Sequence, residues 1–120
     1  MDWIDDSVAV GSLLDAEEVV VLIREDVDLI IDARLCFTSP PNYQPIVNKV
    51  IGSAHLLQVL SEENAKILVH CVWGVDRTPF LAMVYYAQKY GMTYGAAYAV
   101  IKEKHPNTII HPDWVELLEQ

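Results

Sequence analysis

A cysteine and an arginine separated by five residues are the side chains of this sequence best suited to chemistry. They stand in the segment 70–78, which reads HCVWGVDRT. A cysteine thiolate is a strong nucleophile, and it forms most readily in a positive electrostatic environment. The guanidinium group of an arginine can hold two phosphate oxygens at once, which a lysine cannot do. Cys71 and Arg77 are therefore a candidate nucleophile and a candidate phosphate ligand.

The segment lies between an apolar strand pattern and an apolar helix pattern, and this context gives it a binding geometry. Residues 66–69 (KILV) are typical of a buried strand, and residues 79–90 are typical of a helix. A loop at such a junction can direct successive backbone N–H groups at one anion, and the helix dipole adds positive potential. We expect a phosphate cradle of this kind from Val72, Trp73, Gly74, Val75, Asp76 and Arg77.

Strand patterns alternate with helix patterns along the chain. The expected strands are residues 3–4, 8–11, 27–33 (covered on both faces) and 66–70. The expected helices are residues 16–24, 46–60, 77–90 with Gly91 as its stop, 93–105, and a short one from Pro112. This alternation predicts a single-domain α/β sandwich over residues 1–120, with a central, mainly parallel sheet flanked by helices. Ligands of such sheets bind beyond the carboxyl ends of the strands, where the Cys71 loop is located.

The composition limits the classes of function. With 120 residues, of which 52% are hydrophobic and 21% charged, the chain is expected to form one globular domain. No apolar run is long enough for a bilayer span, and the acidic N-terminus does not have the pattern of a signal peptide. A formal charge of -9 without a Lys/Arg cluster disfavours nucleic acid and membranes as partners. Two cysteines without a secretion signal indicate a reducing compartment, and we expect a cytoplasmic monomer.

The segment 70–78 resembles the signature of the cysteine-based protein tyrosine phosphatases, most closely their small dual-specificity branch. The histidine before the cysteine, the central glycine and the Arg-Thr pair all match. Residues 3–12 (WIDDSVAVGS) resemble the opening strands of that domain, and residues 92–106 (MTYGAAYAVIKEKHP) resemble the helix after the loop helix. The resemblance implies a protein-tyrosine-phosphatase-like fold without metal or cofactor. It also implies a phosphomonoester hydrolase that acts through a cysteinyl-phosphate on Cys71. Phosphotyrosine proteins are the favoured substrates, with phosphoserine, phosphothreonine and small phosphoesters left open.

The resemblance also implies roles for the residues around the nucleophile. Thr78 corresponds to a hydroxyl that supports the thiolate as a leaving group, although a hydroxyl at a helix start also satisfies backbone donors. His70 is expected to orient the loop from a second layer, or to be only a buried histidine at a strand end. Gly74 is expected to make a backbone turn where a Cβ would crowd the phosphate. Trp73 either packs against the domain or shapes the rim of the pocket.

Two aspartates compete for the role of general acid. The family usually takes an aspartate from a mobile loop before the cysteine, but residues 35–61 contain no acidic side chain. Asp76 is favoured, because the Gly-x-Asp-Arg-Thr pattern resembles the myotubularin lipid phosphatases and a carboxyl beside a bound dianion can keep its proton. Its alternative role is a carboxylate paired with a nearby arginine or lysine. Asp32, at the end of a predicted strand, is second, because a structural pairing with Arg34 or Arg77 is more typical there.

Two further side chains have open assignments. Cys36 follows the same predicted strand as Asp32, so a reversible disulfide with Cys71 is one hypothesis, although an ordinary buried thiol is favoured. His111 lies roughly where the family carries a polar residue that orients the hydrolytic water. A role at the start of the last helix is favoured for it.

Two other classes of function compete with the phosphatase. Residues 31–34 (IDAR) resemble the strand signature of rhodanese-like or arsenate-handling domains, which also use a cysteine loop, although His70 and the Arg-Thr pair argue against them. A non-enzymatic phosphate- or phosphopeptide-binding module would keep the cradle and lack the acid. Within the phosphatase hypothesis, the Asp76 pattern supports a phosphoinositide substrate, whereas the negative charge opposes it.

Overall fold

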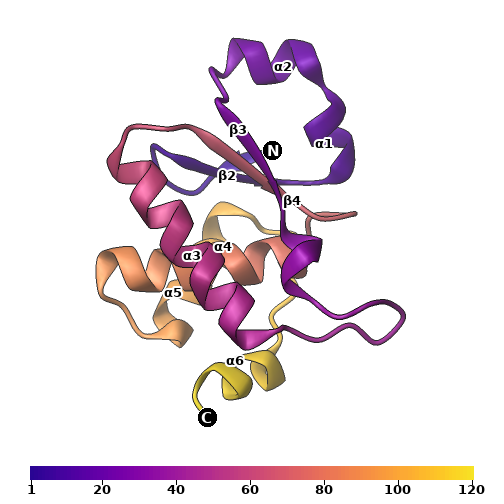
Figure 1. Ribbon diagram of the computed structural model, residues 1–120, viewed down its shortest axis with the longest axis vertical. Coiled ribbons are helices and arrows are strands. Elements are labelled where there is room, and N and C mark those ends of the chain that lie inside the picture. The colour runs from indigo at the N-terminus through magenta and orange to yellow at the C-terminus, as the bar shows by residue number, and fades with distance from the viewer.

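Four short strands form the central sheet of the domain (Figure 1). The computed structural model describes residues 1–120. They are β1 (Asp2–Trp3), β2 (Val8–Gly11), β3 (Leu29–Asp32) and β4 (Ile67–His70). The strand order is β1-β2-β4-β3. β1 pairs antiparallel with β2, whereas β4 pairs in parallel with both β2 and β3. The expected mainly parallel sheet is therefore confirmed.

Helices pack against both faces of this sheet, as expected for an α/β sandwich (Figure 1). One face carries α3 (Val47–Glu62), α4 (Arg77–Tyr90) and α5 (Tyr94–Lys104). The other carries α1 (Leu13–Glu17) and α2 (Val19–Arg24). A short 3-10 helix, η1 (Ala33–Cys36), follows β3, and α6 (Pro112–Leu118) is the last helix. None of the helices combines the length and the apolar character needed to cross a membrane.

Alternate residues of the two inner strands supply the two sides of the core. The side chains that join the main core under α3, α4 and α5 are Val8, Val10, Ile67 and Val69. Ala9 and Leu68 join a smaller cluster with Leu22 of α2. This alternation is the period of two that a strand imposes on its side chains. Since β4 is buried along its whole length, it provides a rigid base for the residue that follows it.

α4 is the central helix of the main core. Its residues from Phe80 to Tyr85 are all buried, which explains its nearly continuous apolar sequence. Gly91 ends the helix in the left-handed conformation, with φ of 64°, and its N–H donates to the Ala87 carbonyl. The expected glycine stop is confirmed, because this φ is easily accessible only to glycine.

The expected single helix over residues 16–24 is in fact two short helices. Ser12 and Asp15 form a capping box: the Asp15 N–H donates to Ser12 Oγ, and the Ser12 N–H donates to the Asp15 carboxylate. This cap starts α1 before residue 16. Glu18, with φ of -82° and ψ of 74°, then separates α1 from α2.

The expectation that the strand at 27–33 is covered on both faces is wrong. β3 begins at Leu29 and is the edge strand of the sheet. Leu29 and Ile30 are 41% and 46% exposed. No strand pairs with the outer edge of β3. In α2, Leu22 is the one buried residue. An apolar run cannot distinguish such an edge strand from a central one.

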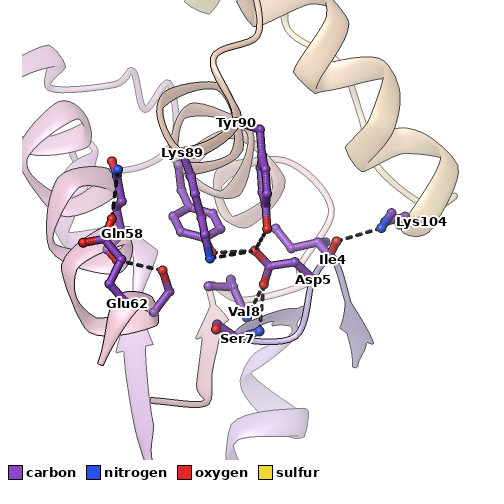
Figure 2. A network of polar contacts seen from close by, with 11 residues as sticks. Ile4, Asp5, Ser7, Val8, Gln58, Glu62, Lys89, Tyr90 and Lys104 are labelled. Carbon is purple, nitrogen blue, oxygen red and sulfur yellow. Dashed lines mark hydrogen bonds and ion pairs between the residues drawn. The ribbon is translucent and has the colours of Figure 1, made fainter. Parts of the chain in front are cut away.

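A carboxylate at the turn between β1 and β2 connects the sheet to α4 (Figure 2). Asp5 accepts hydrogen bonds from the N–H groups of Ser7 and Val8, both at 2.8 Å. It also accepts from the hydroxyls of Tyr85 at 2.5 Å and Tyr90 at 2.9 Å. Burial opposes ionisation, but these hydrogen bonds prevail, so the pKa of Asp5 lies below its ordinary value of 3.8.

We expect Asp5→Asn to destabilise the domain at neutral pH by about 1.5–3 kcal/mol, the range for hydrogen bonds to a charged group. Because the pKa of Asp5 is lowered by folding, its contribution is complete above 3.8 and is lost as the pH falls through the folded value. Urea denaturation of wild type and variant at pH 7 and pH 3 measures this difference. Asp6→Asn at the exposed neighbouring position is the control. An equal loss at both pH values would contradict the assignment.

Candidate active site

The loop of residues 71–76 connects β4 to α4 at the carboxyl ends of the parallel strands. Cys71 follows β4 directly and is 1% exposed, and Arg77 is the first residue of α4. Because the strand and the helix are both buried, the two ends of the loop are fixed by the core. The structure therefore has the strand-loop-helix arrangement that the sequence predicts.

Backbone donors from outside the loop hold two of its carbonyl groups. The Val72 carbonyl accepts a hydrogen bond from the Leu13 N–H at the start of α1, at 3.0 Å. The Val75 carbonyl accepts one from the Ile109 N–H, in the segment before α6, at 2.6 Å. Both contacts orient their peptide groups so that the carbonyls face the surrounding protein.

A histidine at the end of α5 holds a third carbonyl. His105 Nε2 lies 2.6 Å from the Gly74 carbonyl oxygen, and Nδ1 lies 2.5 Å from Asp2 Oδ2 in β1. The imidazole is buried between these two acceptors, so its orientation is fixed. Sequence reasoning missed His105, and no local pattern marks it, because its contact with the loop joins positions far apart in the chain.

The N–H groups of the loop are left free by these carbonyl contacts. The amides of residues 72–76 donate no hydrogen bond within the protein, whereas the next amide, that of Arg77, donates to Asp76 Oδ1 at 2.7 Å. A run of free N–H groups at the start of a helix is an anion-binding nest. The backbone can therefore bind a phosphate group beside Cys71.

Gly74 is required by the backbone, for a reason that differs from the expected one. Its φ is 73°, as in the expected turn. A Cβ at this position would lie 2.5 Å from the carbonyl oxygen of Gly11, at the end of β2. The glycine therefore allows the loop to approach the neighbouring strand.

Two buried polar side chains at the start of α4 have atoms without a partner. Arg77 is 5% exposed and its Nε makes no hydrogen bond, and the same holds for Oγ1 of Thr78. Leaving a buried polar group unpaired costs about 1–3 kcal/mol. The Arg77 guanidinium is instead stacked over the ring of Tyr43, with Cζ 4.0 Å from the ring centroid. Both atoms are available to a bound oxyanion or to the nucleophile.

Asp76 caps α4 and is held on both carboxylate oxygens. Oδ1 accepts from the Arg77 N–H, and Oδ2 accepts from the Tyr43 hydroxyl at 2.6 Å. Arg77 Nε is 4.0 Å from Oδ1, and His111 Nε2 is 3.6 Å from Oδ2. The carboxyl group also lines a pocket of about 320 Å³, whose other walls are Pro41, Asn42, Tyr43, Gln44, His111, Asp113 and Trp114.

Tyr43 belongs to the proline-rich loop of residues 37–45 (FTSPPNYQP), for which no site residue was expected. Burial and the neighbouring Asp76 carboxylate raise the pKa of Tyr43 to about 12. The hydroxyl therefore keeps its proton at neutral pH and acts as a donor to Asp76. A single tyrosine in a loop carries no signal in the sequence, because its role depends on a contact with a residue 33 positions away.

Asp32 is bound to Arg34 and does not line the pocket. Arg34 Nε donates to both Asp32 oxygens, at 2.9 Å and 3.1 Å, and Nη2 donates at 2.7 Å. The Arg34 N–H adds a fourth bond at 3.0 Å. Burial opposes ionisation, but the bonds from Arg34 outweigh it and keep the pKa of Asp32 below its ordinary value. These contacts favour the structural alternative for Asp32.

His70 and Cys36 contact the surrounding protein. His70 is buried, and its Nδ1 lies 3.1 Å from the Cys71 carbonyl oxygen. Cys36 and Cys71 are both free thiols. The sulfur of Cys36 lies 3.2 Å from Ser53 Oγ and 3.7 Å from the Lys49 carbonyl, both in α3, and burial raises its pKa. The structure therefore favours the buried thiol over a disulfide.

Trp73 does not pack into the domain, since it is 76% exposed. With Val72 it borders an apolar hollow beside α1, whose other walls are Ser12, Leu13, Leu14 and Glu17. Of the two alternatives for this residue, packing against the domain is therefore wrong, and a position at the rim of the substrate pocket stays a prediction.

Known proteins share this arrangement of sheet, loop and helices. The sequence profile described as "Dual specificity phosphatase, catalytic domain" matches residues 41–119. Protein-tyrosine-phosphatase IBR5 of Arabidopsis thaliana is 27% identical over 64 residues, which are 53% of this chain and 25% of that protein. The chain thus matches about a quarter of the length of this curated relative.

Solved structures extend the likeness to nearly the whole chain. A leucine rich repeat and phosphatase domain containing protein from Entamoeba histolytica superposes with a TM-score of 0.85 at 13% identity, covering 98% of this chain and 87% of that one. The human tyrosine phosphatase-like serine/threonine/tyrosine-interacting protein gives 0.83 at 18% identity, covering 99% and 93%. At these identities the superpositions establish the fold, and the profile match establishes the family. The chain belongs to the dual specificity phosphatase catalytic domain family, which confirms the expected family and fold.

Proposed function

We propose that this domain hydrolyses phosphomonoesters through a cysteinyl-phosphate on Cys71, as a protein-tyrosine or dual-specificity phosphatase. The free amides of residues 72–76, next to Cys71 and Arg77, are the observation that carries the proposal. Together they provide a site for a phosphate dianion within reach of a nucleophile. We further propose that residues 1–120 act as a single catalytic domain, a cytoplasmic monomer.

The first chemical step transfers the phosphoryl group to the cysteine. The Cys71 thiolate attacks phosphorus, an S–P bond forms, and the P–O bond to the leaving group breaks. Arg77 and the loop amides bind the phosphoryl oxygens, on which negative charge develops. The departing oxygen takes a proton from the Asp76 carboxyl group, so that the leaving group departs as a neutral alcohol or phenol.

The second step releases inorganic phosphate. Water attacks phosphorus, its proton passes to the Asp76 carboxylate, and the S–P bond breaks to return the thiolate. The buried Oγ1 of Thr78, which has no other partner, is available to stabilise that thiolate. The enzyme returns to its initial protonation state.

Asp76 is a better candidate than Asp32 for the proton donor. Asp32 makes four hydrogen bonds with Arg34, which stabilise its charged form. Asp76 lines the pocket beside the loop, and it lies next to the residue that binds the phosphate, Arg77.

Phosphotyrosine is the substrate class that we favour, with phosphoserine and phosphothreonine also accepted. The pocket of about 320 Å³ adjoins the loop at Asp76, and neither Cys71 nor Arg77 lines it. It is open and is lined largely by polar residues, with the Tyr43 and Trp114 rings among them. An aromatic phosphoester can contact such rings, and an open pocket also admits smaller groups.

A phosphate- or phosphopeptide-binding module is the second candidate. Its support is that both Asp76 oxygens already accept hydrogen bonds, from Tyr43 and from the Arg77 N–H, so the carboxylate has a structural role of its own. One structural neighbour is described as a tyrosine phosphatase-like interacting protein. With the chain assigned to the phosphatase family, the rhodanese-like alternative has no remaining support.

The first test is hydrolysis of p-nitrophenyl phosphate by the wild-type protein and by Cys71→Ser. We expect turnover by the wild type and none by the variant, because an alcohol cannot replace the thiolate as nucleophile here. The nitrophenolate leaves easily, so this assay tests the nucleophile and the loop even if acid catalysis is weak. Absence of turnover by folded, reduced wild type, with phosphate binding retained, would favour the binding module.

The second test compares Asp76→Asn with Asp32→Asn on a phosphotyrosine peptide. We expect Asp76→Asn to lower kcat by roughly 10²–10⁴-fold, the usual contribution of a general acid, and p-nitrophenyl phosphate turnover by much less. Asp32→Asn should change kcat little, because its carboxylate contacts Arg34. The reverse order of effects would assign the acid to Asp32.

The third test concerns the support of the loop by His105. The amide of His105→Gln can replace Nε2 as a donor to the Gly74 carbonyl, whereas the shorter His105→Asn can replace only Nδ1. We expect His105→Asn to weaken binding of inorganic phosphate about fivefold, for a lost bond of about 1 kcal/mol, and His105→Gln to retain most of the affinity. Calorimetric titration measures this, with Glu103→Gln at the exposed neighbouring position as control. Equal affinities of the Gln and Asn variants would contradict a role through Gly74.

A further inference from the structure

His111 is a partly buried titratable group to which the catalytic steps above assign no role. Its Nε2 atom is shielded from solvent and has no hydrogen-bond partner. The carboxylate oxygen closest to this nitrogen is Asp76 Oδ2, at 3.6 Å. This separation is longer than a hydrogen bond, but a small shift of the carboxyl group is enough for proton transfer.

The position of the imidazole is fixed by the aromatic core. The His111 ring stacks on the indole of Trp114, with ring centroids 3.6 Å apart and planes inclined by 10°. Trp114 is itself buried against Phe37, Phe80 and Tyr43. The ring therefore presents Nε2 to Asp76 without the freedom of an exposed side chain.

The charged and titratable groups around His111 come from four segments. Asp76 and Arg77 lie at the start of α4, and Tyr43 lies in the proline-rich loop. Asp113 Oδ1 of α6 is 3.9 Å from His111 Nδ1, and the Tyr98 hydroxyl of α5 accepts from the His111 N–H at 3.2 Å. A carboxylate oxygen therefore lies within 4 Å of each ring nitrogen, at 3.6 Å and 3.9 Å.

We propose that His111 exchanges a proton with Asp76 and so keeps this carboxyl group competent as the acid of the phosphatase reaction. The inference rests on the proposed function and names a second proton carrier for it. When a phosphate dianion binds beside Asp76, the two negative charges repel. The N–H bond of the His111 imidazolium then breaks, an O–H bond forms on Asp76 Oδ2, and His111 becomes neutral.

The exchange balances over one turnover. Asp76 gives the proton to the leaving oxygen in the first step, and it takes one from the attacking water in the second. On release of phosphate that proton returns from Asp76 to His111. Tyr43 cannot substitute in this role, because its pKa of about 12 keeps it protonated throughout.

The test compares phenyl phosphate, which has a poor leaving group, with p-nitrophenyl phosphate in wild type and His111→Gln. The glutamine amide can still donate to Asp76 but has no proton to give. We expect kcat for phenyl phosphate to fall by about tenfold, part of the range for acid catalysis, with little change for p-nitrophenyl phosphate. The alkaline limb of the phenyl phosphate pH profile should also move to lower pH, because Asp76 alone must then retain the proton.

The controls separate proton exchange from a structural role. His111→Gln should weaken binding of inorganic phosphate more at high pH than at low pH, because the proton from His111 no longer offsets the repulsion between Asp76 and the dianion. A merely structural role would weaken binding equally at both pH values. Tyr43→Phe, which removes the other contact to Oδ2, should not move the alkaline limb downward. In the background of Asp76→Asn, His111→Gln should cause no further loss.

Three outcomes would each overturn the proton-exchange role while leaving the proposed phosphatase activity intact. They are an equal loss of kcat on both substrates, an alkaline limb that does not move, and additive effects of His111→Gln and Asp76→Asn. Absence of wild-type turnover on either substrate would instead overturn the phosphatase, and this inference with it.

Discussion

The hydrogen bonds that hold the loop carbonyls outward are the constraint on which the site depends. In a peptide group the N–H and the C=O point in opposite directions, so a carbonyl fixed toward the protein directs the adjoining N–H to the other side. The Leu13 N–H, His105 Nε2 and the Ile109 N–H each fix one carbonyl in this way. Each bond is worth only about 1 kcal/mol, yet together they preorganise the amides before any anion arrives.

The three donors come from α1, from the end of α5 and from the segment before α6. The conformation of the loop therefore depends on the whole fold. α1 approaches from the face of the sheet opposite to α5. His105 is connected through Asp2 to β1, the first strand. A change that loosens any of these segments frees a carbonyl without touching the nucleophile. The edge strand β3 supplies none of the three donors, so its exposed side chains are less restricted by the site.

Local signals in the sequence predict the elements, and long-range contacts explain what they miss. The segment 70–78 is recognised because its residue types and spacing form a local signature, and Gly91 because its own φ ends the helix. Apolar runs predict a strand before Asp32 but cannot show that it lies at the edge of the sheet, since that depends on which strands pair. Sequence reasoning names both candidate acids. It cannot show which other residues each carboxylate contacts, because the Tyr43 hydrogen bond to Asp76 joins distant positions of the chain.

The proline-rich loop holds the candidate acid in this domain and does not supply it. Residues 35–61 contain no carboxylate, and Tyr43 from this segment instead bonds to the carboxylate of Asp76. An acid at the start of α4 is attached to the most buried helix of the core, so no closing segment is needed to bring it to the phosphate. The same carboxylate then serves two purposes, since it caps α4 through the Arg77 N–H and is the proposed acid. The imidazole of His111, with Nε2 3.6 Å from Oδ2, is the group placed to exchange a proton with it.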